Sequence, residues 1–163
     1  MNYDERFTQL AARDLRNYWG FLSNINKKSD CTRYVLFSNV DPFSPVDCIQ
    51  RKYDESGDFT ESNIELKGRN ISIDKYVDCL IDLQKVQSLM RVADQSGNPS
   101  FVVALYYQSG KLAIWRIEPD GEYQVTTKET LKYGAAPEQG KQAKAVVSLP
   151  LNEATICNFT PIA

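Results

Sequence analysis

The hairpin-like segment of residues 46–69 constrains the fold of this chain more than any other part of the sequence. Two strand-like runs in it flank a turn-forming string, Asp54-Glu55-Ser56-Gly57. Residues that face each other across a hairpin share a midpoint along the chain. The midpoint of Asp47 and Glu65 is Ser56, inside that turn. The sequence therefore predicts that the hairpin brings these two carboxylates together.

The return strand of the hairpin also carries a basic residue. The expected strands span residues 46–53 and 62–69. Because side chains alternate between the two faces of a strand, Glu65, Lys67 and Arg69 are expected on one face. The apolar residues between them, Ile64 and Leu66, are expected to enter the core. Two acids and an ammonium in one patch are typical of divalent-metal phosphodiesterases, in which carboxylates hold Mg²⁺ and a cation positions water or neutralises phosphate charge.

The length and composition indicate one globular domain spanning residues 1–163. The chain has 163 residues, of which 42% are hydrophobic and 25% charged, enough for a substantial single core. The four cysteines show no metal-site or disulfide spacing, so buried free thiols are expected. The N-terminus lacks a signal pattern and no apolar run is long enough to cross a bilayer. We expect a soluble, cytoplasmic protein without a membrane partner.

The absence of histidine excludes several classes of mechanism. Ser-His-Asp and Cys-His hydrolases, nucleases with a histidine base and His-ligated zinc enzymes all need an imidazole. Carboxylate, lysine and tyrosine chemistry remains. The formal net charge of -2 argues against coating of nucleic acid by bulk electrostatics. Any nucleic-acid binding is therefore expected to depend on a local basic patch.

Hydrophobic periodicity predicts the other elements. Apolar residues at helical spacing indicate a first helix over residues 3–25 and a second over 73–95, started by Ser72 or Asp74 and stopped near Gly97. Strand-like composition marks further segments, and a surface loop is expected at residues 134–140. These expected strands are residues 33–40, 101–107, 111–117, 123–127 and 145–149.

This order of elements indicates a mixed α/β (α+β) fold, with a central mixed β-sheet and a helix on each face. Residues 64–117 read as a strand, a crossover helix of about 20 residues and a second strand, which is a parallel unit. The two acids lie beside that unit.

These residues resemble a known family. Pro45-Val46-Asp47 before the hairpin and Glu65-Leu66-Lys67 on its return strand are similar to the motif of the PD-(D/E)xK nuclease superfamily, which has a restriction-endonuclease-like core. The continuation Gly68-Arg69, followed by a helix with a tyrosine and a later lysine, resembles small phage and bacterial members. In this chain Val46 separates the proline from the acid. The resemblance covers about residues 3–117, and residues 118–163 are expected to form a β-rich C-terminal extension.

The resemblance implies a metal site. Asp47 and Glu65 would bind Mg²⁺ or Mn²⁺ together with the backbone carbonyl of Leu66. Lys67 would orient or activate the attacking water. Because its ammonium would lie against two carboxylates that raise its pKa, electrostatic positioning is favoured over a general-base role.

Three further residues have two possible interpretations each. Arg69 is either a phosphate ligand or a surface arginine at a strand end. Lys85, off the apolar face of the second helix, is either a substrate contact or a solvated lysine. Glu5 is either an additional site carboxylate or an acid that stabilises a helix N-terminus.

Other candidates are assigned mainly to structure. Asp58 is expected to serve the turn. Trp115, Tyr106 and Tyr107 have the stacking surface that unpaired bases need, but aromatic residues in strands more often belong to the core. Tyr76 is expected to pack on the apolar face of the second helix.

The sequence therefore predicts a small metal-dependent nuclease that hydrolyses phosphodiester bonds, with DNA as the expected substrate and Mg²⁺ or Mn²⁺ as the cofactor. One alternative is a non-catalytic module that binds nucleic acid or protein and retains the nuclease-like fold. Others are a β-rich accessory protein with an accidental Glu-x-Lys, and a nuclease directed at RNA. The oligomeric state is left open.

Overall fold

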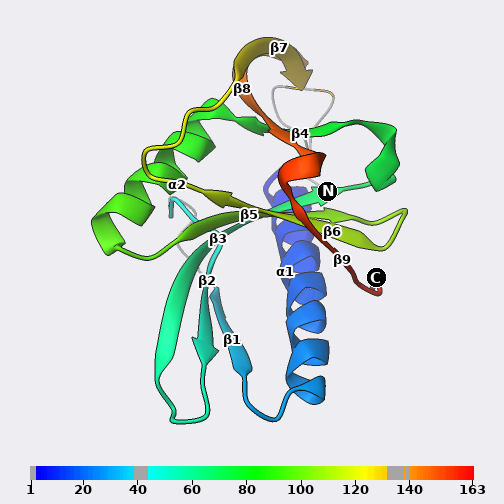
Figure 1. Cartoon of the computed structure of the whole chain (residues 1–163). Coiled ribbons are helices and arrows are strands. Elements are labelled where there is room, and N and C mark those ends of the chain that lie inside the picture. Colours follow the sequence, from blue (N-terminus) through cyan, green and yellow to red (C-terminus); the bar gives the residue numbers. More distant parts are fainter. Residues whose placement is uncertain (1–2, 39–43, 132–137, 139) are drawn as a thin grey trace.

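The computed structural model describes residues 3–38, 44–131, 138 and 140–163, and Figure 1 shows the arrangement of the elements. The chain forms two α-helices, nine strands and short 3-10 turns within these residues. In chain order the elements are α1 (Tyr3–Lys28), β1 (Arg33–Ser38), β2 (Cys48–Tyr53), β3 (Phe59–Arg69), η1 (Ile73–Lys75), β4 (Asp78–Asp82), α2 (Leu83–Ser96), β5 (Ser100–Tyr106), β6 (Lys111–Ile117), β7 (Val125–Leu131), β8 (Lys141–Pro150), η3 (Leu151–Glu153) and β9 (Thr155–Asn158).

The strands form two sheets. The larger has six strands in the order β1-β2-β3-β5-β6-β9, and the smaller has three in the order β4-β8-β7. Strands β3 and β5 are parallel, with Glu65 beside Val102, whereas the other neighbours in both sheets are antiparallel. The predicted central mixed sheet is confirmed, including the parallel pair.

One helix covers each face of the six-stranded sheet (Figure 1). Alternate residues of β5 enter opposite layers of the core. Val103 and Leu105 pack on the side of α1, which contributes Tyr18 and Leu22. On the other side, α2 and the small sheet pack together over the large sheet. The buried residues of this second layer include Val86, Leu89, Ala93, Val102, Ala104, Tyr106, Trp115, Val147 and Leu149. The assignment of Tyr106 and Trp115 to the core is confirmed.

The β2–β3 hairpin has the predicted register. Cys48 lies opposite Ile64, a pairing centred on Ser56. Asp54 shapes the turn, because its Oδ1 accepts hydrogen bonds from the backbone N–H groups of Ser56 (2.9 Å) and Asp58 (3.1 Å). Asp58 thus lies in the turn, as expected.

The second helix differs from its prediction. It begins at Leu83, not at residue 73, because the preceding segment forms a 3-10 turn and then strand β4. Cys79 and Ile81 are buried opposite strand β8, so long-range pairing overrides the local helical pattern. The crossover helix has 14 residues, not about 20. Tyr76 lies outside the helix and is 57% exposed, so its predicted packing role is wrong.

Other element boundaries agree more closely. Gly97 ends α2 with φ of 70°, and its N–H donates to the Ala93 carbonyl at 3.0 Å. Strands β7 and β8 are longer than predicted, and most of the predicted loop at 134–140 lies outside the described residues.

Strand β9 was not predicted. It pairs with β6 at the edge of the large sheet. All four cysteines are free; Cys48 and Cys79 are buried as expected, whereas Cys31 is exposed. Among the described residues, no helix combines the length and apolarity needed to span a membrane.

The C-terminal segment is held against α1 by a buried amide. Asn17 is 1% exposed and bonds the backbone of Ile162 twice: its Oδ1 accepts from the Ile162 N–H at 2.7 Å, and its Nδ2 donates to the Ile162 carbonyl at 3.0 Å. Because both polar groups of the amide are satisfied, burial of Asn17 is tolerated. The contact joins the two ends of the described chain.

Helix α1 is also anchored to β3. The Asp14 carboxylate accepts a hydrogen bond from the Gly68 N–H (3.2 Å) and another from the Tyr107 hydroxyl (2.6 Å). A Cβ at position 68 would lie 2.5 Å from Asp14 Oδ1, which is closer than packed atoms allow. Glycine at this position therefore permits the approach of Asp14.

The substitution Gly68→Ala is expected to destabilise the protein by about 1–3 kcal/mol, the usual cost of overpacking, because it displaces Asp14 from two hydrogen bonds. Gly20→Ala in α1 is the matched control. A Cβ at position 20 meets nothing within 4 Å, so its expected effect is a gain of about 0.5–1 kcal/mol from helix propensity. Chemical denaturation measures both; equal effects would contradict the proposed anchor.

Candidate functional site

The Asp47 carboxylate is held over the backbone of β3. The Asp47 N–H donates to the Ile64 carbonyl at 3.0 Å, and the Leu66 N–H donates to Asp47 Oδ2 at 2.7 Å. Val46, the residue that interrupts the Pro-Asp motif, is 4% exposed and packs in the core layer on the α2 side. Its burial anchors the segment just before β2 and leaves Asp47 exposed at the surface.

Glu65 is a buried carboxylate with incomplete pairing. It is 7% exposed, and its Oε2 lies 3.1 Å from the Nζ of Lys85 on α2. The distance fits an ion pair, but Oε2 has no partner in hydrogen-bond geometry among the described residues. We therefore treat the contact as an ion pair only. Buried charge without full hydrogen bonding is costly and is concentrated at functional sites.

The charges around Glu65 act in opposite directions on its pKa. Burial raises the pKa of the Glu65 carboxyl to about 8, the nearby Asp47 charge adds to this rise, and Lys85 and Lys67 oppose it. Burial, with Asp47 and Glu65 contributing, also raises the pKa of the Cys48 thiol to about 12. Asp47, Glu65, Lys67 and Lys85 thus form one electrostatic group.

Lys67 and Arg69 occupy different surroundings on β3. Lys67 is half-buried, two residues from Glu65 and on the same face of the strand. The guanidinium of Arg69 donates to the Leu80 carbonyl at 2.7 Å and to Cys79 Sγ at 3.2 Å. Arg69 is therefore held against β4 and is half-buried.

Two acids of α1, Glu5 and Asp14, are described. Glu5 is exposed near the start of the helix. The carboxylate that α1 presents to β3 is Asp14, which binds the N–H of Gly68 and, by strand alternation, lies on the opposite face of the sheet from Glu65. Sequence reasoning missed Asp14, although the glycine after Glu-x-Lys was a signal of close approach. Within the described chain, no three His, Cys, Asp or Glu side chains form a cluster that would hold a metal.

A depression of about 480 Å³ adjoins the group at Lys85. Its other lining residues come from the segment before β2 and from the start of α2, and they are mostly polar. They are Ser44, Pro45, Asp82, Gln84, Ser88 and Arg91. The polar stripe Gln84, Ser88 and Arg91 follows i, i+4, i+7 spacing, which is the sequence signal that had been overlooked.

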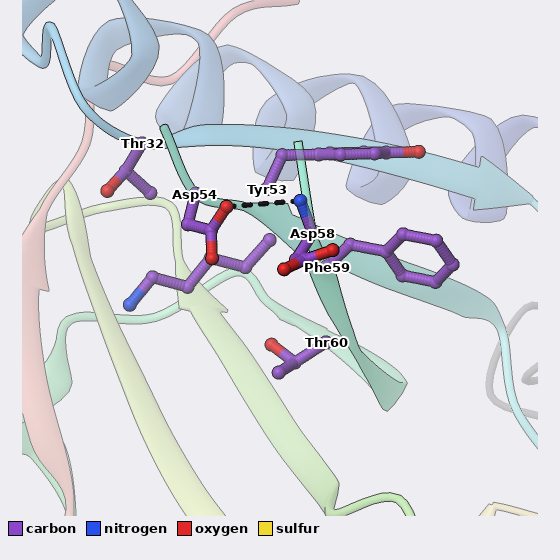
Figure 2. A pocket seen from close by; sticks show the side chains of 7 residues that line it. Thr32, Tyr53, Asp54, Asp58, Phe59 and Thr60 are labelled. Atoms are coloured by element: carbon purple, nitrogen blue, oxygen red, sulfur yellow. Dashed lines mark hydrogen bonds between the residues drawn. The ribbon is translucent and has the colours of Figure 1, made fainter. Parts of the chain in front are cut away.

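A second, smaller depression lies at the far end of the β2–β3 hairpin. It has a volume of about 240 Å³, and Figure 2 shows its lining side chains. Its two acids serve the turn: the dashed line in Figure 2 is the bond from the Asp58 N–H to Asp54. This depression lies at the turn end of the hairpin, whereas Asp47 and Glu65 lie at the other end, and it has no evident chemistry.

The comparisons with known proteins give a weak structural likeness. No protein-family model matches the chain, and no curated protein matches it. The chain is similar to a solved structure of Hjc, a Holliday junction resolvase from the archaeal hyperthermophile Archaeoglobus fulgidus, with a TM-score of 0.41 and 16% sequence identity. The match covers 63% of this chain and 76% of the resolvase. A likeness of this strength assigns no function.

The burial of Glu65 predicts a pH-dependent stability of the metal-free protein. The folded-state pKa of about 8 lies above the ordinary value of 4.5, so the folded state binds the proton more tightly than the unfolded state. The associated stability is complete below about pH 4.5 and is lost as pH rises toward 8. Inside that window the loss approaches about 1.4 kcal/mol per pH unit.

Glu65→Gln removes the titrating group. In EDTA, the unfolding free energy of the wild type relative to Glu65→Gln should fall between pH 5 and pH 8. Denaturant titrations at several pH values measure this difference. Lys85→Ala should extend the fall to higher pH, because loss of the ammonium that stabilises the carboxylate raises the pKa of Glu65 further. A difference that does not change with pH would mean that Glu65 stays ionised throughout.

Proposed function

We propose that this chain is a metal-dependent nuclease that hydrolyses phosphodiester bonds, with DNA as its substrate. The observation that carries the proposal is the juxtaposition of Asp47 with the buried, incompletely paired Glu65, together with Lys67 on the same face. A chain selected only for stability gains little from such a group, because each buried charge must be desolvated. The resemblance of the Asp47, Glu65 and Lys67 pattern to PD-(D/E)xK nucleases supports the same chemistry.

The residues fit a divalent cation. Glu65 Oε2 lacks a hydrogen-bond partner among the described groups, and Asp47 supplies a second carboxylate beside it. With the Leu66 carbonyl, this set matches Mg²⁺, which is commonly bound by one or two carboxylates and completed by water and substrate phosphate. Mn²⁺ fits the same oxygen ligands. When bound, such a cation supplies charge stabilisation and promotes ionisation of water.

The lysines of the site complement the acids. The Lys67 ammonium is placed to orient the attacking water and to offset the negative charge that develops on the phosphate. Beside these carboxylates, Lys67 acts through its position and its charge.

Lys85 has a different role in this proposal. Its Nζ neutralises Glu65 in the metal-free protein, and its side chain is 40% exposed beside the 480 Å³ depression. A cation at Glu65 would displace the ammonium by charge repulsion. The long, flexible side chain can then turn toward a substrate phosphate in the depression.

The Lys85–Glu65 ion pair also favours a second candidate, a non-catalytic binding module. In that case Lys85 would be the permanent partner of Glu65, and no cation would be required. Titration with Mn²⁺ separates the two candidates. Binding that disappears in Asp47→Ala and Glu65→Gln supports the nuclease, whereas wild-type protein that binds no Mn²⁺ supports the module.

The substitution Lys67→Ala is expected to lower the rate of cleavage by about 10²–10³, the usual loss when one preorganised contact to the transition state is removed. Its effect on folding should stay within about 1 kcal/mol, because a partly exposed lysine contributes little. Single-turnover cleavage of single-stranded, duplex and branched DNA in Mg²⁺ and Mn²⁺ measures the rate. Mn²⁺ binding should persist in the variant.

Lys52→Ala is the matched control, since Lys52 is an exposed lysine of the same hairpin and lines the depression at its far end. Its cleavage rate should equal that of the wild type. Equal losses in both variants would indicate a general charge effect. If the wild type cleaves RNA and none of the DNA substrates, the proposed substrate is RNA and not DNA.

A further inference from the structure

Strands β7 and β8 form a two-stranded antiparallel ribbon that lies at the top of the molecule in Figure 1, at the opposite end from the β2–β3 turn. Only the C-terminal part of β8 pairs with β4, from Val146 to Pro150. The rest of the ribbon consists of residues 127–131 of β7 paired with residues 141–145 of β8, and no third strand of the described chain pairs with it. The described side chains of β7 are exposed.

The two faces of this ribbon differ in charge. One face carries Thr126, Lys128, Gln142 and Lys144, and no acid among its described side chains. The opposite face carries Glu129 and Lys141, with small residues between them. We refer to the first as the Lys128 face. The ribbon therefore concentrates positive charge on one side, in a chain whose formal net charge is -2.

The two lysines of the Lys128 face lie directly opposite each other. Lys128 is paired with Lys144 in the register of the ribbon. Like charges at directly opposed positions destabilise a strand pair. Lys144 is neutralised by Asp82, at 3.1 Å, whereas Lys128 has no ion-pair partner in the part of the chain that the structure describes. Lys128 is therefore an exposed cation that is available to an anionic ligand.

A chain of contacts connects this face to the candidate site. Asp82, which binds Lys144, lines the 480 Å³ depression, and Lys85 lines the same depression while contacting Glu65. Donor groups at Lys85, Arg91 and Lys144 thus extend from the site, through the depression, to the ribbon, with the acid Asp82 beside Lys144. That distribution suits a long polyanion better than a single small anion.

We propose that the Lys128 face of the β7–β8 ribbon binds the phosphate backbone of a DNA duplex and extends the candidate site along it. A two-stranded ribbon fits the major groove of B-form DNA, whereas the major groove of A-form RNA is too narrow for it. The cationic face supplies the charge complementarity that binding to a phosphate backbone requires. The inference deepens the proposed nuclease function by naming a duplex as the substrate and the ribbon as the element that holds it.

The test compares two lysines of the same ribbon on opposite faces. Binding of a fluorescently labelled DNA duplex is measured by anisotropy over a series of NaCl concentrations in EDTA, so that no cleavage occurs. Lys128→Ala is expected to weaken binding and to lower the slope of log K against log salt by about 0.9, the value of one phosphate contact. Lys141→Ala should match the wild type, and Lys128→Arg should retain binding. The melting temperature of Lys128→Ala should be unchanged or slightly higher, because a repulsion is removed.

Equal losses in Lys128→Ala and Lys141→Ala, an unchanged salt slope in Lys128→Ala, or a wild type that binds no duplex would each overturn the inference. The proposed nuclease function is judged separately by cleavage and Mn²⁺ binding. If the wild type cleaves DNA and the Lys128→Ala variant binds duplex normally, only the proposed role of the ribbon is wrong. If the chain binds duplex through Lys128 but cleaves no substrate, only the proposed nuclease function is wrong.

Discussion

The hydrogen bond from the Leu66 N–H to the Asp47 carboxylate ties together the two segments on which the rest of the site depends. It exists only because β2 and β3 pair with Cys48 opposite Ile64. A slip of one residue would turn Glu65 toward α1 and Leu66 toward α2, exchanging a core leucine for a buried acid. The apolar residues of β3 therefore specify the register, and the register in turn places the charged residues. Stability of the hairpin and geometry of the site have the same cause.

The sequence predicted those features that depend on nearby residues. The turn at Asp54, the alternation along β3 and the helix stop at Gly97 all follow from local stereochemistry, and each is present. The second helix was predicted too long because Val77, Leu80 and Ile81 fit helical spacing, although Cys79 and Ile81 also fit the alternation of a strand. Only their pairing with β8, far along the chain, decides between the two. The same limit explains why Asp14 and the polar stripe of α2 were missed, since their roles depend on contacts between distant elements.

In the Lys85–Glu65 pair, the lysine occupies the place that a bound cation would take, and the pair contributes little to stability. A buried ion pair seldom contributes net stability, because both charges must be desolvated. Here the ammonium belongs to a flexible, 40% exposed side chain, whereas the carboxylate is fixed by β3 and lacks a hydrogen bond on Oε2 among the described residues. Under the proposed function, the lysine preserves the geometry of the acid until a cation replaces it. The pair then links metal binding to the availability of a positive charge for the substrate.

The contact between buried Asn17 and Ile162 has a consequence for the order in which the parts of the protein fold. Its two bonds to Ile162 connect residues 145 positions apart, and β9, which completes the large sheet beside β6, lies just before that contact. During synthesis α1 emerges before β9, and its contact with Ile162 must wait until residue 162 has left the ribosome. Contacts of such long sequence separation form late, because the entropy of closing the loop is lost before any bonding energy is gained. Helix α1 is therefore synthesised before the hairpin but completes its contacts after the hairpin has formed. A nascent chain would bring the two acids of the hairpin together before the large sheet is complete.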